Sequence, residues 1–124
     1  MKVIVGRISL KDHPTAAHLQ VGTVAGYQVV VGRHYDEGTM GFFIPDGAIV
    51  PDKIAEEMWV KGKLSGKNKD KVKAREMHGV FSEGLFYGSR FWMLEAEEKI
   101  YKESASWNPL WVEGQYVSEE IGVT

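Results

Sequence analysis

The chain has 124 residues, no cysteine and a formal net charge of −2, with 44% hydrophobic and 26% charged residues. This length and composition are typical of one globular domain, and the missing thiols exclude disulfides, cysteine nucleophiles and cysteine zinc sites. No run approaches 18 apolar residues, and the N-terminus lacks a signal-peptide pattern. We therefore expect a cytoplasmic protein without a membrane segment.

Charge is distributed unevenly along the chain. Residues 61–94 carry eight basic and three acidic side chains, whereas residues 95–124 carry two basic and seven acidic ones. The middle segment is therefore +5 and the last segment −5. A local basic surface, and not the field of the whole protein, is the feature that favours a polyanionic partner.

Short strands separated by turns are predicted for the first half of the chain. β-Branched and apolar runs indicate strands at residues 2–10, 19–24, 27–32 and 40–45. Pro14 ends the first run, because proline fixes its own backbone and restricts the residue before it. Ala25-Gly26 favours a tight hairpin turn between the second and third.

The second half is predicted to contain a helix, a loop and two more strands. Pro51 and the spacing of Ile54, Met58 and Trp59 indicate a short helix. The polar segment 60–71 is expected to be an exposed loop. Strands follow at 72–77 and 84–88, joined through 78–83 and its glycine.

Helical structure is predicted at two places near the C-terminus. Residues 91–103 contain few breakers, and Phe91, Leu94 and either Ile100 or Tyr101 suit one helical face. In the segment 118–122, Ser118 is expected as an N-cap and Gly122 as a stop.

These elements favour a mainly β fold. We predict a single domain, residues 1–124, with a small OB-like barrel of about five or more strands at 2–88 and a short helix between strands. A C-terminal extension, about 89–124, is expected to be helical or irregular. An SH3-like barrel and an irregular α+β domain are the alternatives.

Four segments carry a resemblance to a known family. They are "HPTAAHL", "GYQVVV", "IPDGAIVP" and "VKAREMHGVFSEGL", in this order between residues 13 and 85. The order and spacing resemble the N-terminal OB-like domain of RNA ligases related to the Deinococcus enzyme. The resemblance implies an accessory module that engages nucleic acid. Transfer-RNA-binding OB domains carry a similar His-Pro opening and are an alternative.

The resemblance does not extend to the catalytic part of such ligases. Those enzymes join this module to a nucleotidyltransferase domain, in which the lysine of a Lys-x-Asp-Gly motif takes the adenylyl group. Here the one Asp-Gly pair, Asp46-Gly47, has no lysine two positions before it. The family's glutamine before the second corner glycine is Glu83 here. We expect no ligase activity in this polypeptide, no cofactor, and a nucleotidyltransferase domain or other protein as a partner.

Basic residues before the glycine corner are the strongest candidates for binding. Strand alternation places Lys71, Lys73 and Arg75 on one face, about 7 Å apart per step, with Val72 and Ala74 toward the core. This spacing is close to that of phosphates along a nucleic-acid strand. The full set of predicted nucleic-acid-binding residues is Lys67, Lys69, Lys71, Lys73, Arg75, Arg33 and Tyr87. The alternative is a solvated, solubilising surface.

Aromatic and histidine side chains admit both functional and structural interpretations. Single-strand binders stack bases on aromatic rings, and the candidates are Tyr27, Tyr35, Phe81 and Tyr87, although core packing is the commoner role. The histidines, His13, His18, His34 and His78, lack the spacing of a metal motif, so no metal site is predicted. His13 and His18 are expected to be turn or edge residues. His78 is expected to have a structural role next to Gly79, and a phosphate contact is the alternative.

A second function remains open on the sequence. Trp107, Trp111 and Tyr116 could form an aromatic surface that docks a protein, because tryptophan and tyrosine are common interface anchors.

Overall fold

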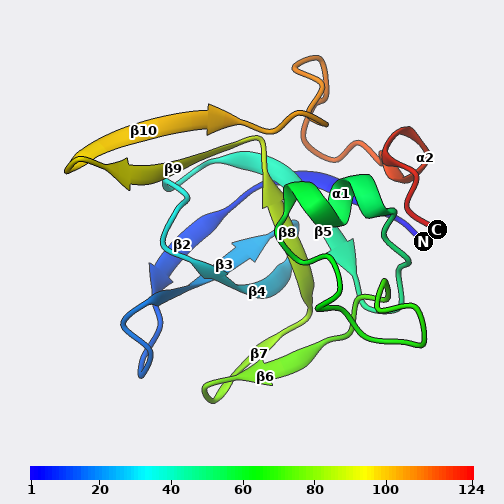
Figure 1. Ribbon diagram of the computed structural model, residues 1–124, viewed down its shortest axis with the longest axis horizontal. Coiled ribbons are helices and arrows are strands. Elements are labelled where there is room, and N and C mark those ends of the chain that lie inside the picture. The colour runs from blue at the N-terminus through cyan, green and yellow to red at the C-terminus, as the bar shows by residue number, and fades with distance from the viewer.

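The computed structural model describes all 124 residues and is mainly β (Figure 1). Its strands and helices are β1 Ile4–Arg7, β2 Ser9–Asp12, β3 Leu19–Val24, β4 Tyr27–Gly32, β5 Met40–Pro45, α1 Asp52–Glu57, β6 Arg75–Met77, β7 Val80–Ser82, β8 Gly84–Gly88, β9 Arg90–Glu95, β10 Glu98–Glu103 and α2 Ser118–Ile121. The predicted fold class is thereby confirmed. Neither helix is long and apolar enough to cross a bilayer.

The predicted first strand divides into two at Ile8. β1 pairs with β5, whereas β2 pairs with β3, so the chain passes from one sheet to another at this residue. The Ile8 side chain is 1% exposed, and its backbone pairs with Gly38 and Thr39 instead of a strand. Ile8 therefore links the two sheets through the core.

The hairpin of β3 and β4 is confirmed. The strands pair from Leu19↔Gly32 to Val24↔Tyr27, leaving a two-residue turn. Ala25 and Gly26 have φ values of 50° and 85°, the left-handed pair that a type I′ turn requires.

The sheets do not close into one hydrogen-bonded barrel, in contrast to the predicted OB-like barrel. The ladders form four separate sheets, β1-β5-β8, β2-β3-β4, β6-β7 and β9-β10. Side chains supply part of the link between β4 and the β7–β8 segment: Gln28 N donates to Glu83 Oε2 at 2.7 Å and Val30 N to Ser82 Oγ at 3.1 Å. No regular ladder pairs β4 with β7 or β8, so the strands do not close into a barrel at this place.

The helix predicted at 91–103 is wrong, because these residues form the hairpin of β9 and β10. Met93 lies opposite Ile100, and the two-residue turn is Ala96-Glu97, with φ values of 50° and 68°. Arg90 lies over the ring of Tyr101 at 3.9 Å. The hairpin extends away from the body of the molecule in Figure 1.

The C-terminal extension, expected to be helical or irregular, thus contains a sheet, and its last part packs into the main core. Val117 and Ile121 are 0% and 7% exposed and cluster with Val3 and Val5. Ser118 is not the N-cap of α2: Val117 holds that position, and Ser118 Oγ accepts a hydrogen bond from Val3 N at 2.7 Å.

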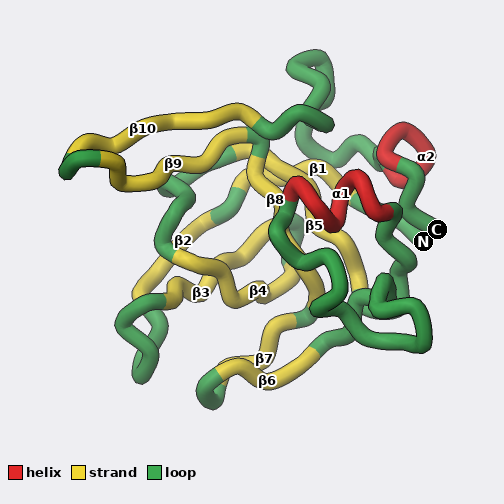
Figure 2. The backbone as a smooth tube through the Cα atoms, viewed as in Figure 1, coloured by secondary structure: helices red, strands yellow, loops and turns green.

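Other predicted boundaries are partly confirmed. Gly122 ends α2 with φ 74°, as predicted. The predicted strand at 72–77 is regular only over β6, and a long loop connects it to α1 (Figure 2).

Candidate nucleic-acid interface

Five cations predicted to bind nucleic acid lie together on the surface. We call Lys67, Lys69, Lys71, Lys73 and Arg75 the basic strip; all five are exposed. The ion pairs of the chain are made by Arg7, Arg33, Lys61 and Lys99, so the strip takes part in none. Between the strip residues, Val72 is 1% exposed and Ala74 is half-buried. The predicted alternation is confirmed.

The backbone of the strip is held by the segment that follows β5. Gly47 N donates to Val72 O at 2.8 Å, and Val72 N donates to Ala48 O at 2.9 Å. Asp46 Oδ1 accepts a hydrogen bond from Ala74 N at 2.7 Å. The backbone is therefore fixed while the cationic side chains point outward.

Lys67 and Lys69 lie on a closed loop before this segment. Ser65 and Lys71 exchange two backbone hydrogen bonds of 2.9 Å, which close the loop at its base. Lys69 has φ 55°, a left-handed conformation that turns the chain within the loop. Lys67 and Lys69 are therefore exposed on a loop that adjoins the extended segment at Lys71.

A basic groove of about 310 Å³ lies beside the strip. Lys63, Lys73 and Arg75 supply its charge. Its remaining lining is mostly apolar and comprises Val30, Val60, Leu64, Val72, Met77, Ser82, Gly84 and Leu85. The groove thus combines cations with an apolar floor, the two features that a nucleotide's phosphate and base require.

The glycine corner, residues 78–84, depends on its two glycines in different ways. Gly79 has φ 87°, and a Cβ there would meet nothing within 4 Å. A Cβ on Gly84 would lie 2.3 Å from Ile44 O, so this glycine lets β8 approach β5. Gly79 therefore permits the turn, and Gly84 permits the close packing of β8 on β5.

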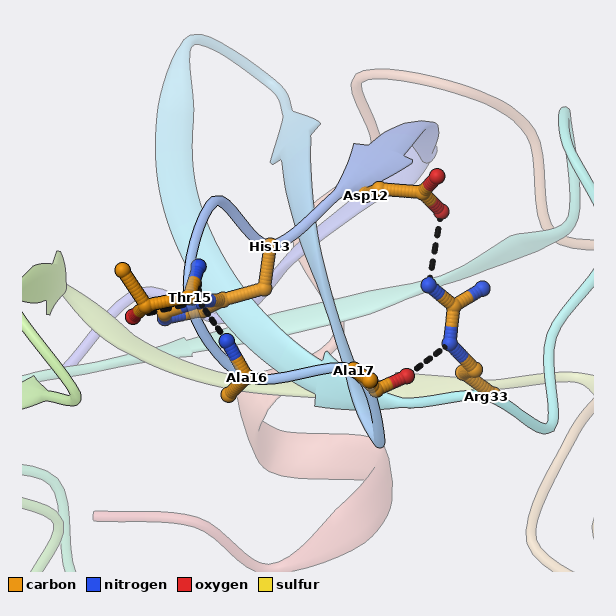
Figure 3. Close-up of polar contacts among 6 residues, drawn as sticks. All are labelled: Asp12, His13, Thr15, Ala16, Ala17 and Arg33. Atoms are coloured by element: carbon orange, nitrogen blue, oxygen red, sulfur yellow. Dashed lines mark hydrogen bonds and ion pairs between the residues drawn. The ribbon is translucent and has the colours of Figure 1, made fainter.

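His13 fastens the loop after β2 to this corner. Its Nδ1 accepts hydrogen bonds from Thr15 N at 3.1 Å and Ala16 N at 3.0 Å (Figure 3). Its Nε2 donates to Met77 O at 2.9 Å, since Nδ1 is already the acceptor. The His-Pro motif is therefore a structural clamp on the corner.

Arg33 differs from the strip because its guanidinium already has protein partners. Nη2 donates to Asp12 Oδ1 at 2.7 Å and Nε to Ala17 O at 2.5 Å, as Figure 3 shows. These bonds hold β2, the following loop and Arg33 together, and they leave fewer donors for an external phosphate than the strip residues retain.

Tyr87 is buried and presents no open ring face. It is 4% exposed, and its hydroxyl donates to Glu57 Oε1 at 3.0 Å. Burial raises the pKa of Tyr87 well above its usual range. Glu57 also accepts hydrogen bonds from the Ser106 amide and hydroxyl, so Tyr87 belongs to a network that links α1, β8 and the segment after β10.

The other predicted stacking residues are divided between the core and the surface. Tyr35 is 7% exposed, and its hydroxyl accepts a hydrogen bond from Gly88 N at 3.1 Å; burial raises its pKa to about 12. Tyr27 stacks on Phe43 with the ring centroids 4.3 Å apart. Phe81 remains half open to solvent.

The predicted aromatic docking surface is not assembled as expected. Trp111 is 7% exposed and packs edge-on against Trp107, whose ring lies over Phe42 in the main core. Tyr116 is exposed, but Trp111 belongs to the main core and Trp107 is partly buried against it.

His18 lies in a turn, as expected, and so do His34 and His78, whereas His13 is 5% exposed and holds the loop after β2. The ring of His78 lies 6.1 Å from that of His13 and 5.6 Å from that of His18. Burial lowers the pKa of His34 below its usual value. No group of three or more histidine or acidic side chains is arranged to hold a metal ion.

Trp59 is a surface residue that sequence reasoning missed. It was expected on the helix, but α1 ends at Glu57 and Trp59 follows its C-cap with φ 56°. At this position glycine is the usual residue, so a tryptophan gives no sequence signal for the end of a helix.

The geometry thus defines a small, mainly β domain with an exposed basic face.

No protein-family profile and no curated protein matches the sequence. Solved structures of the Naegleria gruberi RNA ligase match the fold: a variant with ATP and Mn has a TM-score of 0.73 at 13% identity, and the enzyme with PPi has 0.67 at 17%.

Each of these matches covers 98% of this chain and 34% of the ligase chain. The chain therefore spans about a third of the length of the structures it matches, and it shares the fold of that part. The finer relation to the Deinococcus enzyme stays a prediction.

Proposed function

We propose that the chain is an accessory module that binds RNA, or a nicked duplex containing RNA, through phosphate contacts from the basic strip. The observation that carries the proposal is five exposed cations without ion-pair partners on a backbone fixed by Val72 and Asp46. Such cations can exchange condensed counterions for direct phosphate contacts, which makes binding strong at low salt and largely independent of sequence.

The fold likeness supports this class of function. The relatives in fold are RNA ligases, and this chain corresponds to about a third of them. We propose that the module works beside a nucleotidyltransferase domain and has no ligase activity of its own. Asp46, in the one Asp-Gly pair, accepts a hydrogen bond from Ala74 N and has a structural role here.

Binding to matched nucleic acids tests the proposal. Fluorescence anisotropy is measured with a single-stranded RNA, the same DNA sequence, and nicked duplexes with and without an RNA strand, over a salt series. We expect micromolar or tighter binding that weakens as salt rises. No binding to any of them at low salt would refute the proposal.

Protein docking is a second candidate function, and it rests on a different surface from the one predicted. Leu110, Val112 and Tyr116 are 82%, 61% and 55% exposed within one short segment. Exposed apolar side chains in such a group are typical of interaction sites. A Leu110→Ser, Val112→Ser variant should then lose binding to a separately supplied nucleotidyltransferase domain while keeping nucleic-acid affinity; unchanged binding to that domain would exclude this surface.

A further inference from the structure

Trp59 combines unusual exposure with an unfavourable backbone conformation. It is the most exposed aromatic side chain of the protein, at 59%. Trp59 N donates to Glu56 O at 3.0 Å and Val60 N to Ala55 O at 2.9 Å, which closes the turn that ends α1. Glycine fits the left-handed position of such a turn without strain, whereas tryptophan does not. Strain of this kind points to a functional role.

The ring of Trp59 has a defined orientation. It meets Phe91 edge-on, with ring centroids 5.4 Å apart and an interplanar angle of 80°. Phe91 is itself 8% exposed and belongs to the second core. The indole is therefore supported from one side and open on much of the rest, as a stacking platform must be.

Trp59 stands at one end of a trough whose other end is the basic groove. With twelve other residues it lines an apolar hollow of about 130 Å³. Val30, Val60 and Leu85 line both this hollow and the basic groove. The two hollows are therefore neighbours that share one wall, and we call the pair the trough.

The two hollows of the trough differ in charge. The hollow at Trp59 is lined by the Glu57 carboxylate and by His34. Burial lowers the pKa of His34, so its imidazole is neutral near pH 7. An anion is disfavoured there. Lys63, Lys73 and Arg75 favour an anion at the other end.

We propose that the trough binds one nucleotide unit of a single-stranded nucleic acid, with the base stacked on Trp59 and the adjoining phosphates at Lys63, Lys73 and Arg75. The inference rests on the proposed function and adds a substrate class to it. A base within a duplex is already stacked and paired, so the trough selects an unpaired strand over a continuous duplex.

The test compares a short RNA strand with an abasic strand of the same length and charge, using anisotropy at one low salt concentration. We expect the intact strand to bind about 5- to 150-fold more tightly, the range that stacking on aromatic side chains gives. In a Trp59→Gly variant the two affinities should become equal, and Trp59→Phe should retain part of the difference. The thermal unfolding midpoint of Trp59→Gly should change little, because relief of the strained backbone offsets the lost contact with Phe91.

The possible failures are distinguishable. Equal binding of the intact and abasic strands by the unsubstituted chain would overturn the trough and leave phosphate binding intact. An equal loss for both strands in Trp59→Gly would also overturn it, because stacking predicts a loss for the intact strand alone. If neither strand bound the unsubstituted chain, the proposed function itself would fail.

Discussion

The basic strip and the glycine corner are adjacent in sequence but use their polar groups differently. The strip presents five exposed cations that have no carboxylate partners, on a backbone fixed by its neighbours. At the corner, Ser82 and Glu83 pair with β4, and Gly84 packs against Ile44. Binding and stability should therefore be separable: changes in the strip should alter affinity, and changes at the corner should alter folding.

The largest expected effect is on affinity, from neutralising the strip. The variant carries Lys69→Gln, Lys71→Gln, Lys73→Gln and Arg75→Gln. Four lost phosphate contacts lower the magnitude of the slope of log K against log salt by about 2.8, so the variant should bind a single strand roughly 4,000-fold more weakly at 50 mM salt if the two affinities are equal at 1 M. The free energy of unfolding should change by less than about 0.5 kcal/mol. Anisotropy and urea unfolding measure the two quantities.

A variant with the same change in charge provides the control. Lys2→Gln, Lys11→Gln, Lys53→Gln and Lys102→Gln all alter exposed lysines outside the strip. This control variant should lose much less nucleic-acid affinity than the strip variant. An equal loss would mean that net charge, and not the strip, determines binding.

The next effect is on stability, at the corner. Gly84→Ala places a methyl group against Ile44 O and the ring of Phe43, so we expect a loss of about 3 kcal/mol in unfolding free energy. Gly79→Ala meets open space and should lose only about 1 kcal/mol through its positive φ. Urea unfolding compares them. Equal losses would show that close packing does not explain Gly84.

The His13 clamp should contribute less than Gly84. His13→Ala removes the acceptor of Thr15 N and Ala16 N and the donor to Met77 O, for an expected loss of about 2 kcal/mol. His18→Ala is the matched control, because His18 is exposed and close by. Denaturant unfolding of both variants checks this. A similar small loss in both would contradict the clamp.

The smallest effect concerns pH. The pKa of His34 is lowered in the folded state, so below about pH 6.5 the unfolded chain binds the proton more readily. Stability therefore decreases as pH falls from 7.5 toward 5.5, by less than about 1.4 kcal/mol per pH unit from this group. His34→Gln should flatten the decrease in urea unfolding. An unchanged pH dependence would show that groups other than His34 cause the decrease in stability.

Sequence patterns predicted what depends on neighbours along the chain. The turn at Ala25-Gly26 and the burial of Val72 follow from turn chemistry and strand alternation, and both are present. The exposure of Lys71, Lys73 and Arg75 follows from the same alternation. These parts needed no knowledge of distant contacts.

Features that depend on distant contacts were not predictable. Tyr87 was expected to be available for stacking, yet Glu57 on α1 and the segment around Ser106 enclose it. The hairpin of β9 and β10 turns at Ala96-Glu97, two non-glycine residues with positive φ, so no turn signal distinguished it from a helix. Trp59 likewise has a positive φ without being glycine, so nothing in the sequence signals the end of α1 at this residue.

The most direct test of the central claim is the salt dependence of RNA binding by the unsubstituted chain and by the fourfold strip variant. If the strip contacts phosphates, the slope of log K against log salt should be about 2.8 less steep in the variant, and the two affinities should converge near 1 M salt. Parallel slopes, with the variant weaker by a constant factor or not weaker at all, would contradict phosphate binding by the strip.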